Sequence, residues 1–133
     1  MTRSASREAA FMLLFEASFS NTPDVEELLL LAKEYSDFHY DEYSERLFRE
    51  VVLQQESLDE KINKYSSGWK TTRLPKVSLC VLRLAIYEID NVDDVPAASA
   101  INEAVELTKK FDGENSAKFV NGILGTYVRE NGK

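Results

Sequence analysis

Glycine and proline are scarce in this chain, and their scarcity constrains its fold more than any other feature. The 133 residues include five glycines and three prolines, and most of these fall where boundaries between regular elements are expected. Long stretches without either residue favour helices, because these two residues destabilise a helix interior most. No stretch of useful length alternates apolar and polar residues as a half-buried strand would. The sequence therefore predicts an all-α protein.

Apolar periodicity and boundary residues divide the chain into seven expected helices. Most of the circumference of the first helix is apolar, so we expect this helix to be central and heavily buried. Ser57 and Glu60 have the spacing of a capping box and predict the start of the fourth helix. Pro75 and Pro96 suit the first turns of the next two. The expected helices cover residues 4–19, 24–38, 41–55, 58–65, 75–89, 96–111 and 114–130.

The length suits one compact domain, which we expect to span residues 1–133. Apolar residues make up 44% of the chain, which is enough for a core. Gly68 and Trp69 mark a natural midpoint, so we expect two packed helical halves that share one core without a flexible linker. The single cysteine, Cys80, excludes an internal disulfide, and its apolar helical surroundings predict a buried, unreactive thiol.

No apolar run approaches the roughly 20 residues that cross a bilayer. The first ten residues are polar and do not resemble a signal peptide. We therefore expect a cytoplasmic protein that makes no contact with a membrane.

The formal net charge of −7 argues against a general nucleic-acid binder, since such proteins usually carry a basic excess. The charge is nevertheless polarised along the chain. Residues 21–60 contain twelve acids and three bases, a net charge of −9, whereas residues 61–90 contain six bases and two acids, a net charge of +4. A polarised acidic protein can bind RNA if its bases gather on one face. Solvated helix faces explain the charge pattern alone more simply.

The sequence offers few residues for catalysis. His39 is the only histidine and lies in a tyrosine-rich turn, where we expect a structural or exposed side chain. One histidine and one cysteine cannot build a familiar zinc site, and no phosphate-binding loop, dinucleotide motif or nucleophile elbow is present. The carboxylates at positions 93, 94, 103 and 106 suit a turn and an exposed helix face better than a metal site. We expect a non-catalytic binding protein without a cofactor.

Three motifs follow one another in the C-terminal half. They are VLRLAIYE at residues 81–88, INEAVELTK at 101–109 and KFVNGIL at 118–124, and a Trp69…Arg73 segment precedes them. Their order and spacing resemble the NusB family of transcription antitermination factors. The N-terminal half matches this family mainly in helix pattern and in Arg3-x3-Arg7-Glu8-x-Ala10.

The resemblance implies a seven-helix fold of two three-helix bundles that share one core. It also implies a function without catalysis or cofactor. NusB-like proteins pair with NusE, a small-subunit ribosomal protein, and bind the boxA element of single-stranded nascent RNA. The pair joins an RNA polymerase antitermination complex that reads through terminators during ribosomal RNA synthesis.

The resemblance assigns RNA binding to arginines at the N-terminus, where the family pattern is arginine-rich. This chain keeps only Arg3 and Arg7, which share one helix face at their i, i+4 spacing. They could contact phosphates or stack on single-stranded bases. Fewer arginines predict weaker and less salt-dependent RNA binding. Recognition could depend more on the partner protein, or on Lys70, Arg73 and Lys76.

The KFVNG motif contains both expected core and expected surface residues. We expect Phe119 and Val120 in the core and Gly122 at a close contact between helices, where a side chain would collide. Lys118 and Asn121 should point outward. A lysine can neutralise a phosphate, and an asparagine amide can bond a base edge or a backbone carbonyl.

Phe15 and Glu88 occupy positions that the resemblance assigns to the partner protein. Glu88 could pair with a basic ribosomal protein, and Phe15 could equally be plain core.

Two other functions stay open: a targeting module like that on some ribosomal RNA methyltransferases, and a helical scaffold that has lost RNA binding. The chain could be a monomer or a homodimer.

Overall fold

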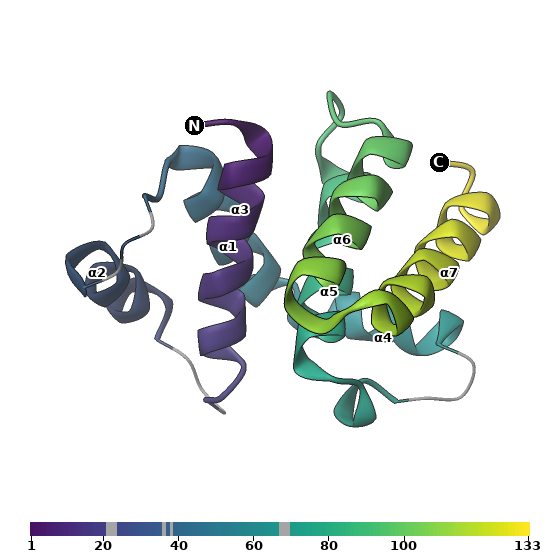
Figure 1. Ribbon diagram of the computed structural model, residues 1–133, viewed down its shortest axis with the longest axis horizontal. Helices are drawn as coiled ribbons and strands as arrows, with labels where there is room; N and C mark the ends of the chain where they lie inside the picture. The colour runs from purple at the N-terminus through teal and green to yellow at the C-terminus, as the bar shows by residue number, and fades with distance from the viewer. Residues whose placement is uncertain (21–23, 36, 38, 67–69) are drawn as a thin grey trace. The chain divides into compact units, whose positions relative to one another are not determined.

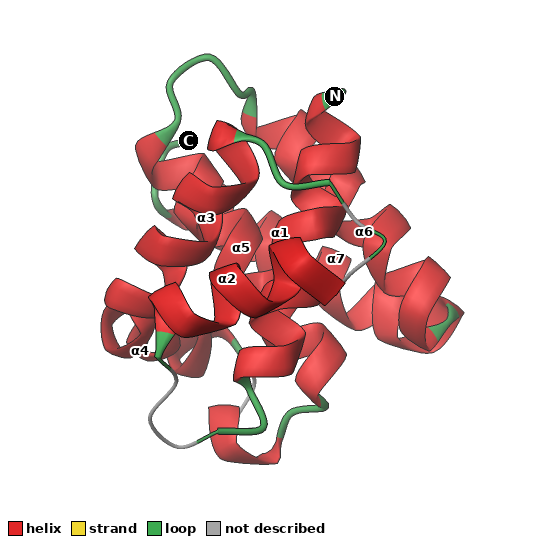
Figure 2. Cartoon of the chain, turned by 90° about the vertical axis from the view of Figure 1, so that its left-hand side faces the viewer, coloured by secondary structure: helices red, strands yellow, loops and turns green. Residues whose placement is uncertain are grey.

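The computed structural model describes residues 1–20, 24–35, 37, 39–66 and 70–133, and over these residues it contains helices and loops but no strand (Figure 1 and Figure 2). Seven α-helices and one short 3-10 helix are present in this part of the chain. Their bounds are α1 Arg3–Ala17, α2 Val25–Tyr35, α3 Glu42–Leu53, α4 Gln55–Tyr65, η1 Thr71–Arg73, α5 Lys76–Asn91, α6 Ala97–Asp112 and α7 Glu114–Glu130. The predicted all-α class and seven helices are confirmed. None of the described helices is both long and apolar enough to span a membrane.

Residues Met1–Gln54 form one compact unit of three helices, α1 to α3. As predicted, α1 is heavily buried, and it packs against both other helices. The apolar side chains buried from α1 and α3 include Phe11, Leu13, Leu47, Phe48 and Val51. The helix α2 contributes less to this core, because only two of its side chains are buried.

Residues Gln55–Lys133 form a second compact unit. Within it α5, α6 and α7 pack against one another as a three-helix bundle, and α4 packs on α5 and α7. Every residue from Cys80 to Glu88 is buried, so α5 is the central helix of this unit. The burial of Cys80, which is 1% exposed, is as predicted.

Polar contacts fasten α4 to its neighbours. The guanidinium of Arg83 in α5 donates through Nε and Nη2 to the two carboxylate oxygens of Asp59 in α4, at 2.7 and 2.8 Å. A bidentate ion pair of this kind fixes the relative orientation of the two side chains as well as the distance between them. Asp90 Oδ2 accepts hydrogen bonds from Lys61 Nζ at 2.7 Å and from the Tyr127 hydroxyl at 2.6 Å, and so connects α4, α5 and α7.

Three boundaries differ most from those predicted. Along the chain, the boundary between the two units falls between Gln54 and Gln55, and not at the expected midpoint of Gly68 and Trp69, which lies outside the described residues. The predicted cap at Ser57 is wrong, because α4 begins two residues earlier, at Gln55, and Ser57 lies within its first turn. The second helix ends at Tyr35, three residues before the predicted end.

Candidate nucleic-acid interface

The start of α1 is fastened to the start of α3 by a short chain of hydrogen bonds. The Thr2 side chain caps α1 by accepting from the Ala5 amide at 3.0 Å. The Ser6 hydroxyl donates to Asp41 Oδ2 at 2.7 Å, and Asp41 Oδ1 caps α3 by accepting from the Ser44 amide at 2.9 Å. Burial alone would raise the pKa of Asp41, but the hydrogen bonds from Ser44 and Ser6 outweigh burial, so the pKa is lowered.

Where the starts of α1 and α3 are joined, Arg3 contacts Tyr43. The guanidinium carbon of Arg3 lies 3.9 Å from the ring centroid of Tyr43, on the first turn of α3. A guanidinium stacked on an aromatic face at this distance gains a cation–π attraction. Arg3 is exposed and Tyr43 is half-buried. The pair therefore presents an oriented cation at the surface of the first unit.

Arg7 has a different environment. It is 5% exposed, on the buried side of α1. This corrects the expectation that Arg3 and Arg7 lie together on one exposed helix face. The i, i+4 spacing does place them near each other along the helix, but α1 is buried over most of its circumference, and the exposed residues of its first turn end before Ser6.

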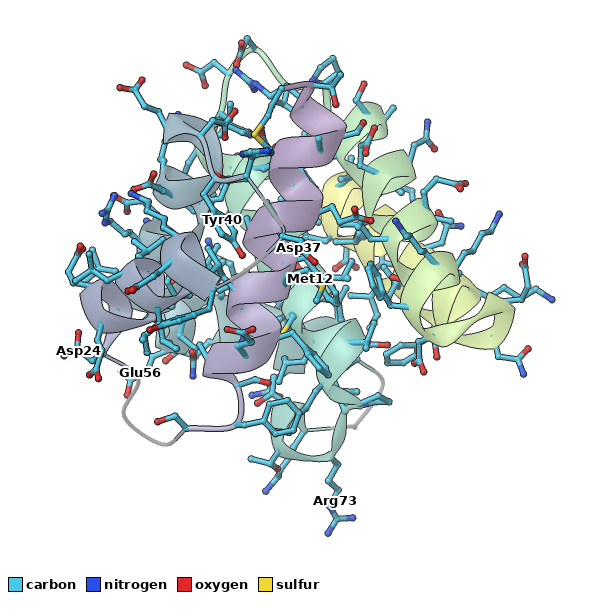
Figure 3. The ribbon with its side chains drawn as sticks, turned by 60° about the vertical axis from the view of Figure 1, so that its left-hand side comes forward. Met12, Asp24, Asp37, Tyr40, Glu56 and Arg73 are labelled. Atoms are coloured by element: carbon cyan, nitrogen blue, oxygen red, sulfur yellow. The ribbon has the colours of Figure 1, made fainter. Side chains whose placement is uncertain are left out.

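A second group of cations lies at one end of the second unit. Lys70, Arg73 and Lys76 are exposed around η1 and the start of α5. Asn63 of α4 holds this segment, because its side-chain oxygen accepts from the Thr71 amide at 2.8 Å. Figure 3 shows the Arg73 side chain pointing away from the ribbon.

A further exposed cation, Lys118, lies near the start of α7. The chain reverses between α5 and α6 and again between α6 and α7, so α5 and α7 begin at the same end of the unit (Figure 1). We call the set of Lys70, Arg73, Lys76 and Lys118 the basic end.

The outer face of α7 continues from the basic end. Lys118, Asn121 and Gly122 are all exposed, and their spacing places them on one face. The outward position of Lys118 and Asn121 is as predicted, and so is the burial of Val120, whereas Phe119 is only half-buried. The prediction for Gly122 is wrong, because among the described residues a Cβ at this position would lie within 4 Å of no side chain and of no neighbouring helix. Gly122 leaves the outer face of α7 bare, so a ligand can approach the backbone closely.

The two residues expected to contact a partner protein have unlike surroundings. Phe15 is half-buried between Phe11, at 6.0 Å between ring centroids, and Phe19, at 5.1 Å with the rings nearly perpendicular. Phe19 is 66% exposed, so these aromatic rings run from the core to the surface. Glu88 is 1% exposed, which corrects the expectation of a surface carboxylate that pairs with a basic protein.

Sequence reasoning missed Tyr43 and Asp41 as parts of the site. Asp41 carried a signal, because an aspartate three residues before Ser44 at the start of a helix is a typical N-cap. Tyr43 carried none, since its role comes from a contact with Arg3, forty residues away in sequence. Within the described chain, no three His, Cys, Asp or Glu side chains are grouped to hold a metal ion.

Comparisons with known proteins match nearly the whole chain to a single family. The model of the NusB family matches residues 4–129. The transcription antitermination protein NusB of Acetivibrio thermocellus is 43% identical over 130 residues, which cover 97% of this chain and 90% of that protein. The protein of the same name from Clostridium novyi is 38% identical, with coverage of 97% and 99%.

Solved structures give the same result. A structure of T. maritima NusB aligns with a TM-score of 0.85 and 36% identity, covering 98% of this chain and 92% of that one. A crystal structure of the antitermination factors NusB and NusE in complex with double-stranded RNA aligns with a TM-score of 0.82 and 25% identity, covering 96% of each chain.

Proposed function

This chain belongs to the NusB family, and from that premise we propose that it is an RNA-binding transcription antitermination factor that acts together with NusE. The observation that carries the proposal is the agreement of sequence and fold over almost the full chain with NusB proteins, one of them solved with NusE and RNA. The exposed cations and the bare face of α7 supply the surfaces that such a role needs.

We propose that RNA is bound by exposed cations and by one amide side chain. Arg3, Arg73, Lys76 and Lys118 carry the positive charge that neutralises phosphates. Asn121 adds an amide that can bond a base edge or the backbone, beside a glycine that lets the nucleic acid come close. Arg7 joins these residues only if its side chain leaves its buried position.

The NusE contact that we propose centres on Phe15. Its ring is reached from the surface through the exposed Phe19, and aromatic rings at a surface supply large contact area at low entropic cost. The acidic balance of the chain suits a basic ribosomal protein. Glu88 is buried and is not part of this proposed contact.

The finer features of the proposal follow from the family resemblance. The RNA is a single-stranded boxA-type element, and the complex supports transcription of ribosomal RNA. The chain acts without catalysis or cofactor, as an adaptor, in the cytoplasm where transcription takes place.

The proposal is tested by RNA binding with and without NusE. Fluorescence anisotropy of a labelled boxA-type RNA and of a scrambled RNA is measured across a salt series. We expect selective binding that NusE strengthens. For each phosphate contact removed, the slope of log affinity against log salt should fall by about 0.7. Arg3→Ala and the double variant Arg73→Ala/Lys118→Ala should show this fall.

Lys33→Ala provides the matched control. It removes one positive charge from α2, where Lys33 pairs with Glu45 at 3.1 Å, outside the proposed RNA surface. It should leave the affinity and the salt slope close to those of the native chain. Absence of selective binding even with NusE present would refute the RNA assignment. A scaffold that contacts only proteins would then be favoured, since a single exposed arginine remains at the N-terminus.

A further inference from the structure

The helix α2 exposes more large apolar side chains than it buries. Only Leu29 and Ala32 are buried, whereas Leu30 is 69% exposed, Leu31 is 47% exposed and Tyr35 is 76% exposed. A helix at the surface of a domain normally directs polar residues outward. Apolar side chains that gather on an exposed face are typical of an interaction site.

A groove lies beside these side chains, within the first unit. It has a volume of about 390 Å³ and is lined by Leu28, Leu31, Ala32 and Tyr35 of α2 and by Glu16 of α1. In Figure 1 α2 lies next to α1, and Figure 2 views the molecule with α2 toward the reader. The groove therefore has apolar walls from one helix and a carboxylate on the other. Apolar walls with a few polar groups are typical of a binding groove.

The rim of the groove is acidic. Glu27 and Glu34 flank Leu31 along one ridge of α2, at positions i−4 and i+3, and Glu16 lies on the α1 side. Glu27 and Glu34 are exposed, as is Glu16. Among the residues that the structure describes, no cation forms an ion pair with any of the three.

Two cations of α2 and α3 pair with other carboxylates. Lys33 pairs with Glu45 at 3.1 Å, and Arg49 pairs with Glu26 at 2.8 Å. The hydrogen bond from Arg49 lowers the pKa of Glu26. These pairs connect α2 to α3, and neither cation pairs with Glu16, Glu27 or Glu34.

We propose that the groove between α1 and α2 binds an amphipathic helix of a partner protein. The apolar stripe of that helix fills the groove against Leu28, Leu31 and Tyr35, and its flanking lysines or arginines pair with Glu16, Glu27 and Glu34. Recognition of one apolar helix face by a groove of this kind is a recurring mode. The acidic rim selects basic flanks and raises the association rate.

The charge also decides against two other occupants. A second copy of this chain would bring an identical acidic rim, so self-pairing would place carboxylates opposite carboxylates. Phosphates of a nucleic acid would meet the same repulsion. The surface goes beyond the proposed function, because it needs neither RNA nor the Phe15 contact with NusE.

The test uses synthetic helical peptides of about 16 residues, long enough for four turns. One panel has leucine, isoleucine, phenylalanine or methionine at i, i+3, i+4 and i+7, with lysines on both flanks. A second panel replaces the lysines by glutamates. Binding to the full chain is followed by amide chemical shifts in NMR. We expect the lysine panel to shift resonances of α2 and of the second half of α1, and to bind more weakly as salt is added.

Two leucine variants locate the site. Leu31→Ser removes an apolar wall of the groove and should weaken the lysine peptides about three- to tenfold. Leu53→Ser is the matched control, since Leu53 is 79% exposed on α3 and does not line the groove, and it should leave the affinity unchanged. Glu27→Gln/Glu34→Gln should weaken binding and reduce its salt dependence without altering the fold.

Several results would overturn the proposal. These are equal binding of the glutamate panel, no shifts at α2 at millimolar peptide, or shifts that depend on protein concentration alone and accompany dimerisation in sedimentation. Loss of NusE binding in Leu31→Ser, with Phe15 intact, would place NusE in the groove and remove the case for a separate partner. The RNA and NusE assays of the proposed function are unaffected by failure of the peptide test.

Discussion

Arg3 shows how one residue can gain a defined orientation from a contact distant in sequence. Its guanidinium lies over the ring of Tyr43, and both residues are placed by the hydrogen bonds that Asp41 makes to α1 and α3. A cation that is already oriented loses less conformational freedom when it meets a phosphate or a base. This arrangement offers a physical route to RNA binding in a chain with few N-terminal arginines.

Tyr43 should therefore affect RNA affinity through Arg3. Tyr43→Leu removes the aromatic face, and we expect RNA affinity to fall about two- to fivefold, as loss of an exposed cation–π contact implies. Tyr43→Phe keeps the face and should bind like the native chain. Anisotropy with the boxA-type RNA measures both. Equal affinities for the two variants would show that the stacking does not matter.

We expect the folded protein to lose stability at high pH because of Tyr127. Its burial and the hydrogen bond that it donates to Asp90 both raise its pKa above the usual value near 10. Because the folded state holds this proton more tightly, the stabilisation is complete below about pH 10 and is lost as pH rises toward the folded-state pKa. The free-energy difference between the native chain and Tyr127→Phe should therefore shrink above about pH 10.

Chemical denaturation at a series of pH values from neutral to alkaline measures this difference. Tyr35→Phe is the control, because Tyr35 is 76% exposed, and its difference from the native chain should stay constant. A difference for Tyr127→Phe that is equally constant would contradict the assigned hydrogen bond.

Two glycines in and beside α7 have opposite effects on the stability of the protein. Gly122 lies within α7 with open space around it, whereas Gly113 joins α6 to α7 with a φ of 98°, a conformation that side chains with a Cβ rarely adopt. Glycine in a helix interior is unfavourable relative to alanine. We expect Gly122→Ala to raise the free energy of unfolding by about 0.5–1 kcal/mol and Gly113→Ala to lower it by about 1 kcal/mol or more.

Thermal or chemical denaturation distinguishes these two effects. The same substitutions bear on RNA binding, since Gly122→Ala places a methyl group on the outer face of α7. A more stable variant with weakened RNA affinity would support close approach at this face. Destabilisation by Gly122→Ala would mean that the open space around Gly122 is filled in solution.

The helices themselves could largely be predicted from the sequence. Local signals fix them: Pro75 and Pro96 precede α5 and α6, and Gly113 separates α6 from α7. The start of α4 could not, because α3 and α4 are separated by Gln54 alone and no breaker residue marks the junction. Ser57 therefore gave a false boundary, as a capping pattern also occurs by chance inside a helix.

At the scale of the whole molecule, family motifs predicted the function class, and residue spacing predicted exposure only partly. Lys118 and Asn121 were correctly placed outside, since the apolar period of α7 shows which face is buried. The burial of Arg7 and Glu88 was missed, because charged residues are rarely buried and their sequence surroundings give no sign of it. The open face at Gly122 was missed because a glycine in a helix is compatible with close packing or with exposure.

As a member of the NusB family, this chain should promote read-through by RNA polymerase together with NusE. The most direct measurement is transcription in vitro across a terminator, on a template with a boxA-type element and on one with the element scrambled. We expect greater read-through when the chain and NusE are both present on the boxA template, and a smaller increase with Arg3→Ala than with Lys33→Ala. Equal read-through on both templates, or with and without the chain, would contradict it.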